Sequence, residues 1–255
     1  MLKSVACYAL HYGKEYLAWS IRSTQDAVDE VLVLYAAAPS FGHGGEVPCP
    51  ETEEELLQEA NRFATKPVRW HPGRWRSELE HRFAALAEAR KAGADLVLVV
   101  DADELWAPGV AQTTLRSVYD ANRAGRWMAS FRNFWRSFDW EVRDGFLPVR
   151  IVDLRHPLTF DANLRHDEQP EPVLHFGYAQ SEQMVRYKWS CHGHQSELRP
   201  DWLEKKFLNW TPESTDLHPV ARDLWKKAYP VSPHVQGLVG HLLADHPYYR
   251  QSLIR

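Results

Sequence analysis

The sequence predicts an α/β protein with a mostly parallel central sheet flanked by helices, followed by a small helical appendage at the C-terminus. Three observations support this fold class. Apolar runs alternate with helical patterns through the N-terminal part of the chain, and this order gives parallel strands joined by right-handed crossovers. The run LVLVV at residues 96–100 is continuous and branched, as in a strand buried on both faces. Carboxylates follow that run directly, at the sheet edge where α/β proteins bind ligands.

The N-terminal segments can be assigned in order. Residues 4–10 form a short apolar run suited to a buried strand, residues 28–35 are a second strand, and residues 68–71 are a candidate third strand. Residues 17–21 have helical spacing. Residues 51–63 begin with acidic side chains, which the dipole of a helix favours at its N-terminus.

The clearest helical pattern covers residues 74–91. Gly93 follows it, in the position where a left-handed residue commonly ends a helix. Because large apolar residues fall on one stripe, we expect that stripe to face the sheet. The stripe consists of Trp75, Leu79, Phe83 and Leu86.

The pattern changes after Pro108. A helix is expected over residues 113–125, with Leu115 and Val118 facing inward. Further strands are expected at residues 127–140, 149–154 and 158–160, and residues 173–178 are expected to form a strand or a loop. Further helices are expected at residues 181–189, 201–210 and 219–229.

Length and composition suit a globular protein. The 255 residues are 44% hydrophobic and 25% charged, which is ordinary for a folded domain. We expect a main domain over residues 1–198, in two halves at 1–106 and 107–198, with a helical extension over 199–255.

Composition also excludes several classes. Cys7, Cys49 and Cys191 suggest no disulfide framework, so we expect a reducing, cytoplasmic location. No apolar segment is long enough to span a membrane, and residues 1–3 leave no room for a secretory signal before the first strand. A net charge of -4 argues against a surface that coats nucleic acid, although a local basic patch stays open.

The carboxylates after the buried strand are the main candidate for chemistry. Alternation would place Asp101 and Asp103 on one side and Ala102 on the other. Two such oxygen ligands can hold Mg²⁺ or Mn²⁺, and the ion can hold a diphosphate. A plain polar turn is the alternative interpretation.

Three segments resemble the GT-A fold glycosyltransferases of the family-two type. CYALHYGKEYLAWSI at residues 7–21 resembles the start of these enzymes, and VLVVDADELW at 97–106 resembles their D-x-D strand. HFGYA at 175–179 resembles their late histidine element. The resemblance covers about residues 4–195. It implies a Rossmann-like GT-A fold, a nucleoside-diphosphate sugar donor (a UDP-sugar favoured) and Mn²⁺ or Mg²⁺ as cofactor.

The resemblance also implies roles for individual residues. Asp103 would be the main metal ligand, helped by Asp101, and His175 would be a third contact. On the donor side, Glu15 would lie near the nucleotide, and an arginine before the long helix would meet the diphosphate. The donor-binding candidates are Tyr12, Glu15, Phe41, Arg74 and Arg76.

A second group of histidines offers an alternative metal site. Cys191, His192 and His194 could suggest zinc, but a fourth ligand is not evident. Either histidine could also replace His175 at the catalytic metal.

An inverting enzyme needs a general base for the acceptor hydroxyl. Asp167 and Glu168 are the candidates, with Asp139 and Glu141 as the fallback. A retaining enzyme would need none, and the sequence leaves the stereochemistry open.

The acceptor side is expected in the aromatic segment FRNFWRSFDW at residues 131–140. Rings stack on sugars and on nucleobases alike, so the acceptor could be a saccharide or a hydroxymethylated base in DNA, as for some phage enzymes. A nucleotidyltransferase and an inactive carbohydrate-binding relative are the alternative functions. The acceptor-binding candidates are Arg132, Trp135, Arg136 and Trp140.

Overall fold

The computed structural model describes residues 2–39, 47–122, 125–155, 157, 161–191 and 195–255. The chain forms two compact units. Unit 1 comprises Met1–Gly42, Glu51–Phe131 and Phe146–Val173, whereas unit 2 comprises His43–Pro50, Arg132–Gly145 and Leu174–Arg255. The boundaries expected from the sequence, after residues 106 and 198, do not coincide with those of the units.

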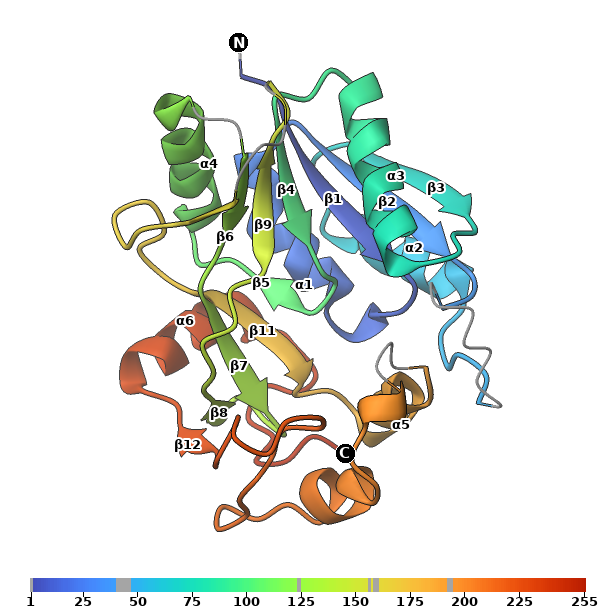
Figure 1. Cartoon of the computed structure of the whole chain (residues 1–255), viewed down its shortest axis with the longest axis vertical. Helices are drawn as coiled ribbons and strands as arrows, with labels where there is room; N and C mark the ends of the chain where they lie inside the picture. Colours follow the sequence, from blue (N-terminus) through green and yellow to red (C-terminus); the bar gives the residue numbers. More distant parts are fainter. Residues whose placement is uncertain (1, 40–46, 123–124, 156, 158–160, 192–194) are drawn as a thin grey trace. The chain divides into compact units, whose positions relative to one another are not determined.

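Unit 1 is built on a seven-stranded sheet in the order β10-β6-β9-β4-β1-β2-β3 (Figure 1). β1 runs parallel to β2 and β4, and β2 runs parallel to β3. Only β9 is antiparallel to its neighbours, β4 and β6. The expected α/β class with a mostly parallel sheet is therefore confirmed. The strands are β1 (Ser4–Leu10), β2 (Glu30–Ala36), β3 (Val68–Gly73), β4 (Leu96–Val100), β6 (Gly125–Met128), β9 (Val149–Asp153) and β10 (Asp161–Asn163).

Helices flank the sheet on both faces. Figure 1 shows α3 in front of β1 and β2, and α1 behind the sheet. On the α1 face, the Tyr8 hydroxyl forms hydrogen bonds with the hydroxyls of Ser20 (3.1 Å) and Thr24 (3.2 Å). On the α3 face, Cys7 packs with Ala85. The unit also contains α1 (Lys14–Thr24), α2 (Glu53–Arg62), α3 (Glu78–Lys91), α4 (Val110–Ala121), a 3-10 turn (Gln25–Ala27) and the short strand β5 (Glu104–Leu105).

Helix α3 differs from its sequence-based prediction. It begins at Glu78, where the Ser77 side chain accepts a hydrogen bond from Glu80 N. The expected inward stripe holds only in part: Trp75 and Leu86 pack against the core, whereas Leu79 and Phe83 are exposed. Small side chains instead bring the helix close to the sheet. The residues that α3 buries are His81, Ala85 and Ala89.

Unit 2 contains a second, smaller set of strands and helices. Its strands follow the order β12-β8-β7-β11. They are β7 (Phe131–Trp135), β8 (Trp140–Val142), β11 (Val173–Tyr178) and β12 (Tyr229–Pro230). The helical segments are α5 (Glu182–Ser190), a 3-10 turn (Gln195–Glu197), a π-helix (Leu203–Leu208) and α6 (Pro233–Leu243).

The C-terminal segment is part of the core of unit 2 and not a separate appendage. Trp202, Phe207 and Trp225 surround Trp135 with ring centroids 5.6 to 6.0 Å away. The expected helix over residues 219–229 does not form, and the helix of this region is α6, which Ser232 caps. The strand expected at residues 158–160 lies outside the described residues.

None of the helices formed by the described residues is long and apolar enough to cross a membrane.

The turn between β1 and α1 packs directly on the turn after β4. Gly13 has a φ of 136°, and a Cβ atom placed on it would lie 2.4 Å from Cβ of Ala102. Ala102 is the middle residue of the D-x-D segment, so this contact holds the segment against the start of α1. Only glycine satisfies both the backbone angle and the close approach.

We predict that Gly13→Ala destabilises the protein by about 2–4 kcal/mol, because it adds a steric overlap to an unfavourable backbone angle. Gly109 (φ 75°) is the matched control, since a Cβ placed there meets no atom within 4 Å. Gly109→Ala should cost only about 1–2 kcal/mol. Urea unfolding measures both, and Ala102→Gly in the Gly13→Ala background should recover the difference. Equal losses at the two glycines would contradict the packing argument.

Candidate functional site

The carboxylates that follow β4 lie in a tight turn. The amide of Glu104 donates to the carbonyl oxygen of Asp101 (3.1 Å), and the amide of Asp101 donates to Oε2 of Glu104 (3.1 Å). The strand ends at Val100. The alternation of side chains along a strand, from which Asp101 and Asp103 were expected on one side, therefore does not apply to this turn. Asp103 and Glu104 are buried, whereas Asp101 is partly exposed.

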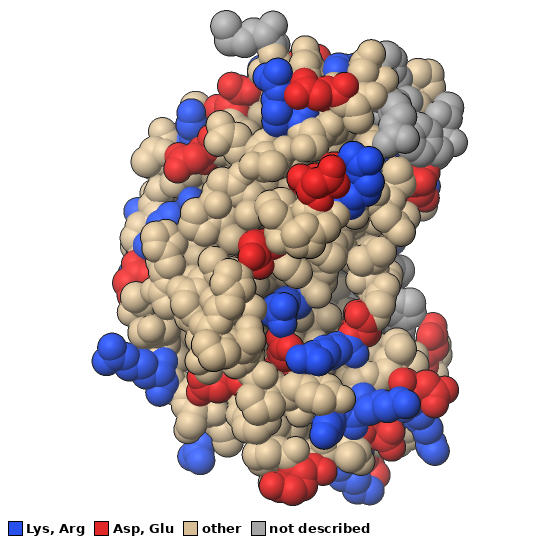
Figure 2. All heavy atoms as spheres, turned by 90° about the vertical axis from the view of Figure 1, so that its left-hand side faces the viewer, with Lys and Arg blue, Asp and Glu red and all other residues tan. Residues whose placement is uncertain are grey.

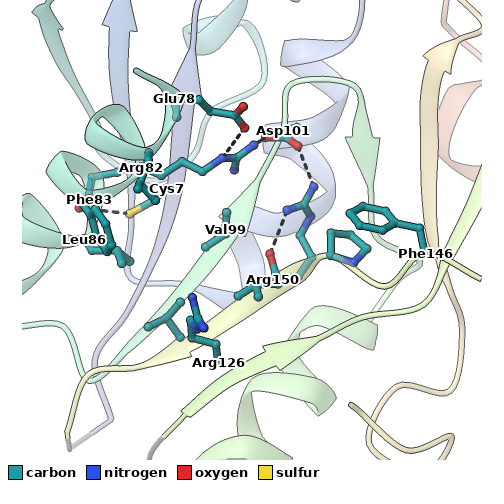
Figure 3. A pocket seen from close by; sticks show the side chains of 16 residues that line it. Cys7, Glu78, Arg82, Phe83, Leu86, Val99, Asp101, Arg126, Phe146 and Arg150 are labelled. Carbon is teal, nitrogen blue, oxygen red and sulfur yellow. Dashed lines mark hydrogen bonds and ion pairs between the residues drawn. The ribbon is translucent and has the colours of Figure 1, made fainter. Parts of the chain in front are cut away.

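Two arginines converge on Asp101 from different elements (Figure 3). Arg82 of α3 places Nη2 3.4 Å from Oδ1, and Arg150 of β9 places Nη2 2.7 Å from Oδ2. The same Nη2 of Arg150 contacts Oε1 of Glu104, and Nε of Arg82 donates to Glu78 (2.8 Å). Alternating charges therefore form a chain from the surface of α3 to the interior of the sheet.

The charged groups in this series change one another's pKa values. Burial raises the pKa of Glu104 to about 8; Arg150 opposes the rise, and Asp101 adds to it. The nearby Asp101 raises the pKa of Arg82. Burial disfavours the charge on Arg150, but Glu104 and Asp101 outweigh it and raise the Arg150 pKa. Both arginines therefore stay cationic, while Glu104 changes charge near neutral pH.

The N-terminus of α1, at the same sheet edge, is closed by a carboxylate. Glu51 is buried and accepts hydrogen bonds from the amides of Gly13 (2.7 Å) and Lys14 (3.0 Å). Burial raises the pKa of Glu51, although both amides act against the rise. Free amides at a helix N-terminus suit a phosphate, but Glu51 already occupies those of Gly13 and Lys14. An anion bound at this edge would therefore have to use positive side chains.

The donor-binding candidates occupy different environments. Tyr12 is half-buried with its ring edge-on to His11, and Glu15 is half-buried in the first turn of α1. Arg74 and Arg76 are exposed and precede α3. Phe41, in the Gly-rich loop at residues 40–45, lies outside the described part of the chain.

His175 lies on β11 in unit 2, where a polar chain fixes its ring. Nδ1 of His175 is 2.6 Å from Oδ1 of Asn133. Nδ2 of Asn133 donates to Asp144 (3.5 Å), which also accepts from Nε1 of Trp225 (2.5 Å). Because this orientation of Asn133 presents an acceptor, Nδ1 of His175 is the donor and Nε2 carries the lone pair. That tautomer suits a metal ligand.

The proposed general bases lie in one turn of unit 1. Glu168 is buried and accepts from the amide of Arg165 (2.8 Å), so it stabilises its own turn. Asp167 is exposed, and Arg165 lies 3.4 Å from it. Of the two, only Asp167 is open to a ligand in this structure.

The acceptor-binding candidates divide between the core and the surface of unit 2. Trp135 is fully buried, so it offers no face for stacking. Arg136 is also buried; it pairs with Glu182 (3.2 Å) and lies 4.4 Å above the ring of Phe207. These two residues stabilise the core, and the structure corrects their expected role.

Arg132 and Trp140 remain at least partly exposed. Arg132 pairs with Glu141, which Arg143 also contacts at 3.0 Å. Glu141 is buried between two arginines, so of the two fallback bases only Asp139 is exposed.

A divalent ion would find only part of a ligand set in this structure. Among the residues that the structure describes, no three His, Cys, Asp or Glu side chains are grouped to hold a metal. Magnesium sites often use one or two carboxylates and take their other oxygens from substrate phosphates. Asp101 and Asp103 would be those carboxylates here, and both oxygens of Asp101 face guanidinium groups.

Two of the three cysteines come together in unit 2. The Tyr187 hydroxyl lies within hydrogen-bonding reach of Cys49 and of Cys191. Cys49 therefore lies near Cys191, a proximity that the sequence did not reveal. His192 and His194 lie outside the described residues.

Comparisons with known proteins give weak likenesses only. No protein-family model and no curated protein matches the sequence. A protein from Desulfovibrio desulfuricans G20 assigned as a nucleotide-diphospho-sugar transferase is similar in structure, with a TM-score of 0.37 and 11% identity over 64% of this chain and 82% of that one.

Two further solved structures are similar at a comparable level. The 4-diphosphocytidyl-2C-methyl-D-erythritol synthase of Anaerococcus prevotii DSM 20548 has a TM-score of 0.34 and 12% identity over 60% of this chain and 70% of that one. A UDP-glucose pyrophosphorylase has a TM-score of 0.31 and 13% identity over 69% and 74%. At these TM-scores the likenesses do not decide the activity.

The most informative residues of the site were missed in the sequence. Arg82 forms an i, i+4 pair with Glu78, a pattern that normally indicates an exposed helix surface. Arg150 did leave a signal, because it is a charged residue inside the apolar strand VRIVD, and such a buried charge needs a partner. Glu51 left none, since it reaches α1 across 38 residues.

We predict a pH dependence from Glu104. Its pKa is about 8 in the folded protein against 4.5 as the ordinary value, so the folded state binds the proton more tightly. Relative to Glu104→Gln, the wild-type protein should therefore lose stability as the pH rises from about 5 to 8. Urea unfolding of both proteins across this range measures the difference. A difference that stays constant with pH would show that Glu104 keeps its ordinary pKa.

Proposed function

We propose that this chain is a glycosyltransferase that moves a sugar from a nucleoside-diphosphate sugar, with a UDP-sugar favoured, to a hydroxyl acceptor. The turn after β4 carries the proposal. Asp101 and Asp103 stand at the carboxyl end of a buried parallel strand, and Arg82 and Arg150 converge on Asp101. Carboxylates and guanidinium groups at this edge suit a ligand that carries both hydroxyls and a diphosphate.

The two aspartates are proposed to divide the work. Asp103 is the proposed ligand of Mn²⁺ or Mg²⁺, and a bound ion would neutralise charge on the leaving diphosphate. Asp101 is about one-third exposed, and Arg82 and Arg150 fix its orientation. A carboxylate has further lone pairs beyond those two contacts, so Asp101 can accept a hydrogen bond from a ribose hydroxyl.

Arg82 is the proposed contact to the diphosphate. Its side chain is 35% exposed although it pairs with Glu78 and Asp101, and the planar guanidinium fork matches phosphate oxygens. Arg150 is buried, so we assign it to orienting Asp101. Arg74 and Arg76, together with Tyr12 and Glu15, remain proposed donor contacts.

His175 of unit 2 remains a proposed metal ligand, because Asn133 holds it in a tautomer with the lone pair on Nε2. Asp167 remains the proposed general base for an inverting reaction, since it is exposed while Glu168 serves its own turn.

The proposed acceptor is a saccharide hydroxyl. On the face shown in Figure 2, basic and acidic side chains are interspersed and form no continuous basic surface. A hydroxymethylated base in DNA is the alternative. Duplex DNA that binds with a steep salt dependence would favour the base, and negligible binding would favour the saccharide.

The donor can be identified before the acceptor is known. A thermal-unfolding panel of nucleotide sugars and nucleoside triphosphates, each with and without Mn²⁺, tests the class of substrate. The proposal expects one nucleotide sugar to raise the melting temperature in a manner that depends on Mn²⁺. Stabilisation by a triphosphate alone would indicate a nucleotidyltransferase, and no stabilisation by any sugar nucleotide would overturn the proposal.

We predict that Asp103→Asn lowers metal-dependent donor hydrolysis by about 100-fold or more, because even residues that only orient a metal ligand contribute about 10–100-fold. The control is Asp120→Asn, which removes a carboxylate from an exposed ion pair on α4. Both variants should keep the wild-type circular dichroism spectrum. Unchanged hydrolysis in folded Asp103→Asn would remove this residue from the site.

We also predict that Asn133→Ala weakens the dependence on Mn²⁺ by about 10–100-fold, because His175 loses the acceptor that fixes its tautomer. Asn133→Asp keeps an acceptor at Nδ1 and should restore most of the affinity. Titration of activity with Mn²⁺ measures the change, and ¹⁵N chemical shifts of the His175 ring report its tautomer. A tautomer change that leaves the Mn²⁺ dependence unaltered would exclude His175 as a ligand.

A further inference from the structure

Unit 1 contains a cavity of about 720 Å³ on the face of the sheet that α3 covers only in part. Its floor is formed by β1, β4 and β9, and its walls by α3 and by the segment that leads into β9 (Figure 3). The volume lies in the range of small-molecule sites. The residues that line it include Leu79, Phe83, Leu86, Val99, Phe146 and Val149.

The mouth of this cavity exposes large apolar side chains. Phe146 is 70% exposed, Leu79 63% and Phe83 55%. Three other large hydrophobic residues of the described chain are exposed, at 39–46%, and none of them lines the cavity. Such a concentration of apolar surface marks a binding site more often than chance exposure does.

One end of the cavity is polar and electrically balanced. Glu78, Arg82, Asp101 and Arg150 line that end in alternating order, two negative and two positive. Arg126, which lines the opposite side, is offset by its pair with Asp161 at 2.6 Å. An ionic head group that brings no metal ion to neutralise it would leave an unbalanced charge there, whereas a hydroxyl can donate to a carboxylate and accept from a guanidinium.

We propose that this cavity binds an uncharged alcohol with an apolar body. The body packs against Phe83 and Phe146, and the hydroxyl meets Asp101 and Arg82 at the polar end. The inference concerns binding without a donor. Because Asp101 and Arg82 are also proposed donor contacts, the alcohol and a nucleotide sugar should compete for them.

The head group can be tested with one matched series of probes on the full chain without any donor. The series is 4-butylphenol, butylbenzene, 4-butylbenzoate and 4-butylbenzylammonium, measured by saturation-transfer NMR and titration. Because hydrogen bonds to charged groups are the stronger ones, the phenol should bind at least about tenfold more tightly than the other three. Equal binding of the hydrocarbon, or tighter binding of either ion, would overturn the assignment of the head group.

The location can be tested with exposed positions, which keeps the fold intact. Leu79→Lys and Phe83→Ala should each weaken the phenol by about tenfold, because they remove apolar wall. Leu57→Lys is the control, since Leu57 is an exposed leucine of α2 outside the cavity. Thermal unfolding verifies that all three variants fold.

Two results would overturn the location. One is phenol affinity that Leu79→Lys and Phe83→Ala leave unchanged. The other is light scattering that shows a wild-type dimer which Leu79→Lys converts to a monomer while the phenol binds neither form. In that case a second copy of the chain would be the occupant of this surface.

Discussion

A charged residue in the middle of the sheet governs the candidate site. Arg150 is 5% exposed within an otherwise apolar strand, and a buried cation is tolerated only when carboxylates surround it. Asp101 meets this need from the turn after β4, and Glu104 adds a second carboxyl contact from the same turn. The geometry of that turn is therefore set by electrostatic compensation, which links the end of β4 to the antiparallel strand β9.

The same principle extends to the rest of this sheet edge. Glu51 occupies the N-terminus of α1, so the helix dipole is already satisfied by a carboxylate of the protein. The positive potential that an anionic ligand could use comes from Arg82, on the opposite face of the sheet from α1. A phosphate bound at the N-terminus of α1 would first have to displace Glu51. A phosphate bound by Arg82 would leave Glu51 in place.

The fold was largely predictable, because β1, β2 and β4 are local apolar runs that can be recognised without knowledge of their neighbours. The inner face of α3 was not. Periodicity identifies the stripe with Leu79 and Phe83, but the helix buries His81 and Ala85, since close approach to the sheet favours small side chains. In the candidate site, Asp101 and Asp103 were proposed from their place after a buried strand. Arg82 was missed because its pairing with Glu78 resembles an ordinary surface pair.

The contact between Gly13 and Ala102 has a consequence for finding relatives of this chain. The two positions lie 89 residues apart, yet the size of one side chain limits the other, with only 2.4 Å available. Substitutions at the two sites should therefore be correlated during evolution. A residue larger than alanine at position 102 should occur together with a different backbone at position 13, at the start of α1. A search that scores this pair jointly would recognise distant homologues that the acidic residues alone cannot distinguish from chance.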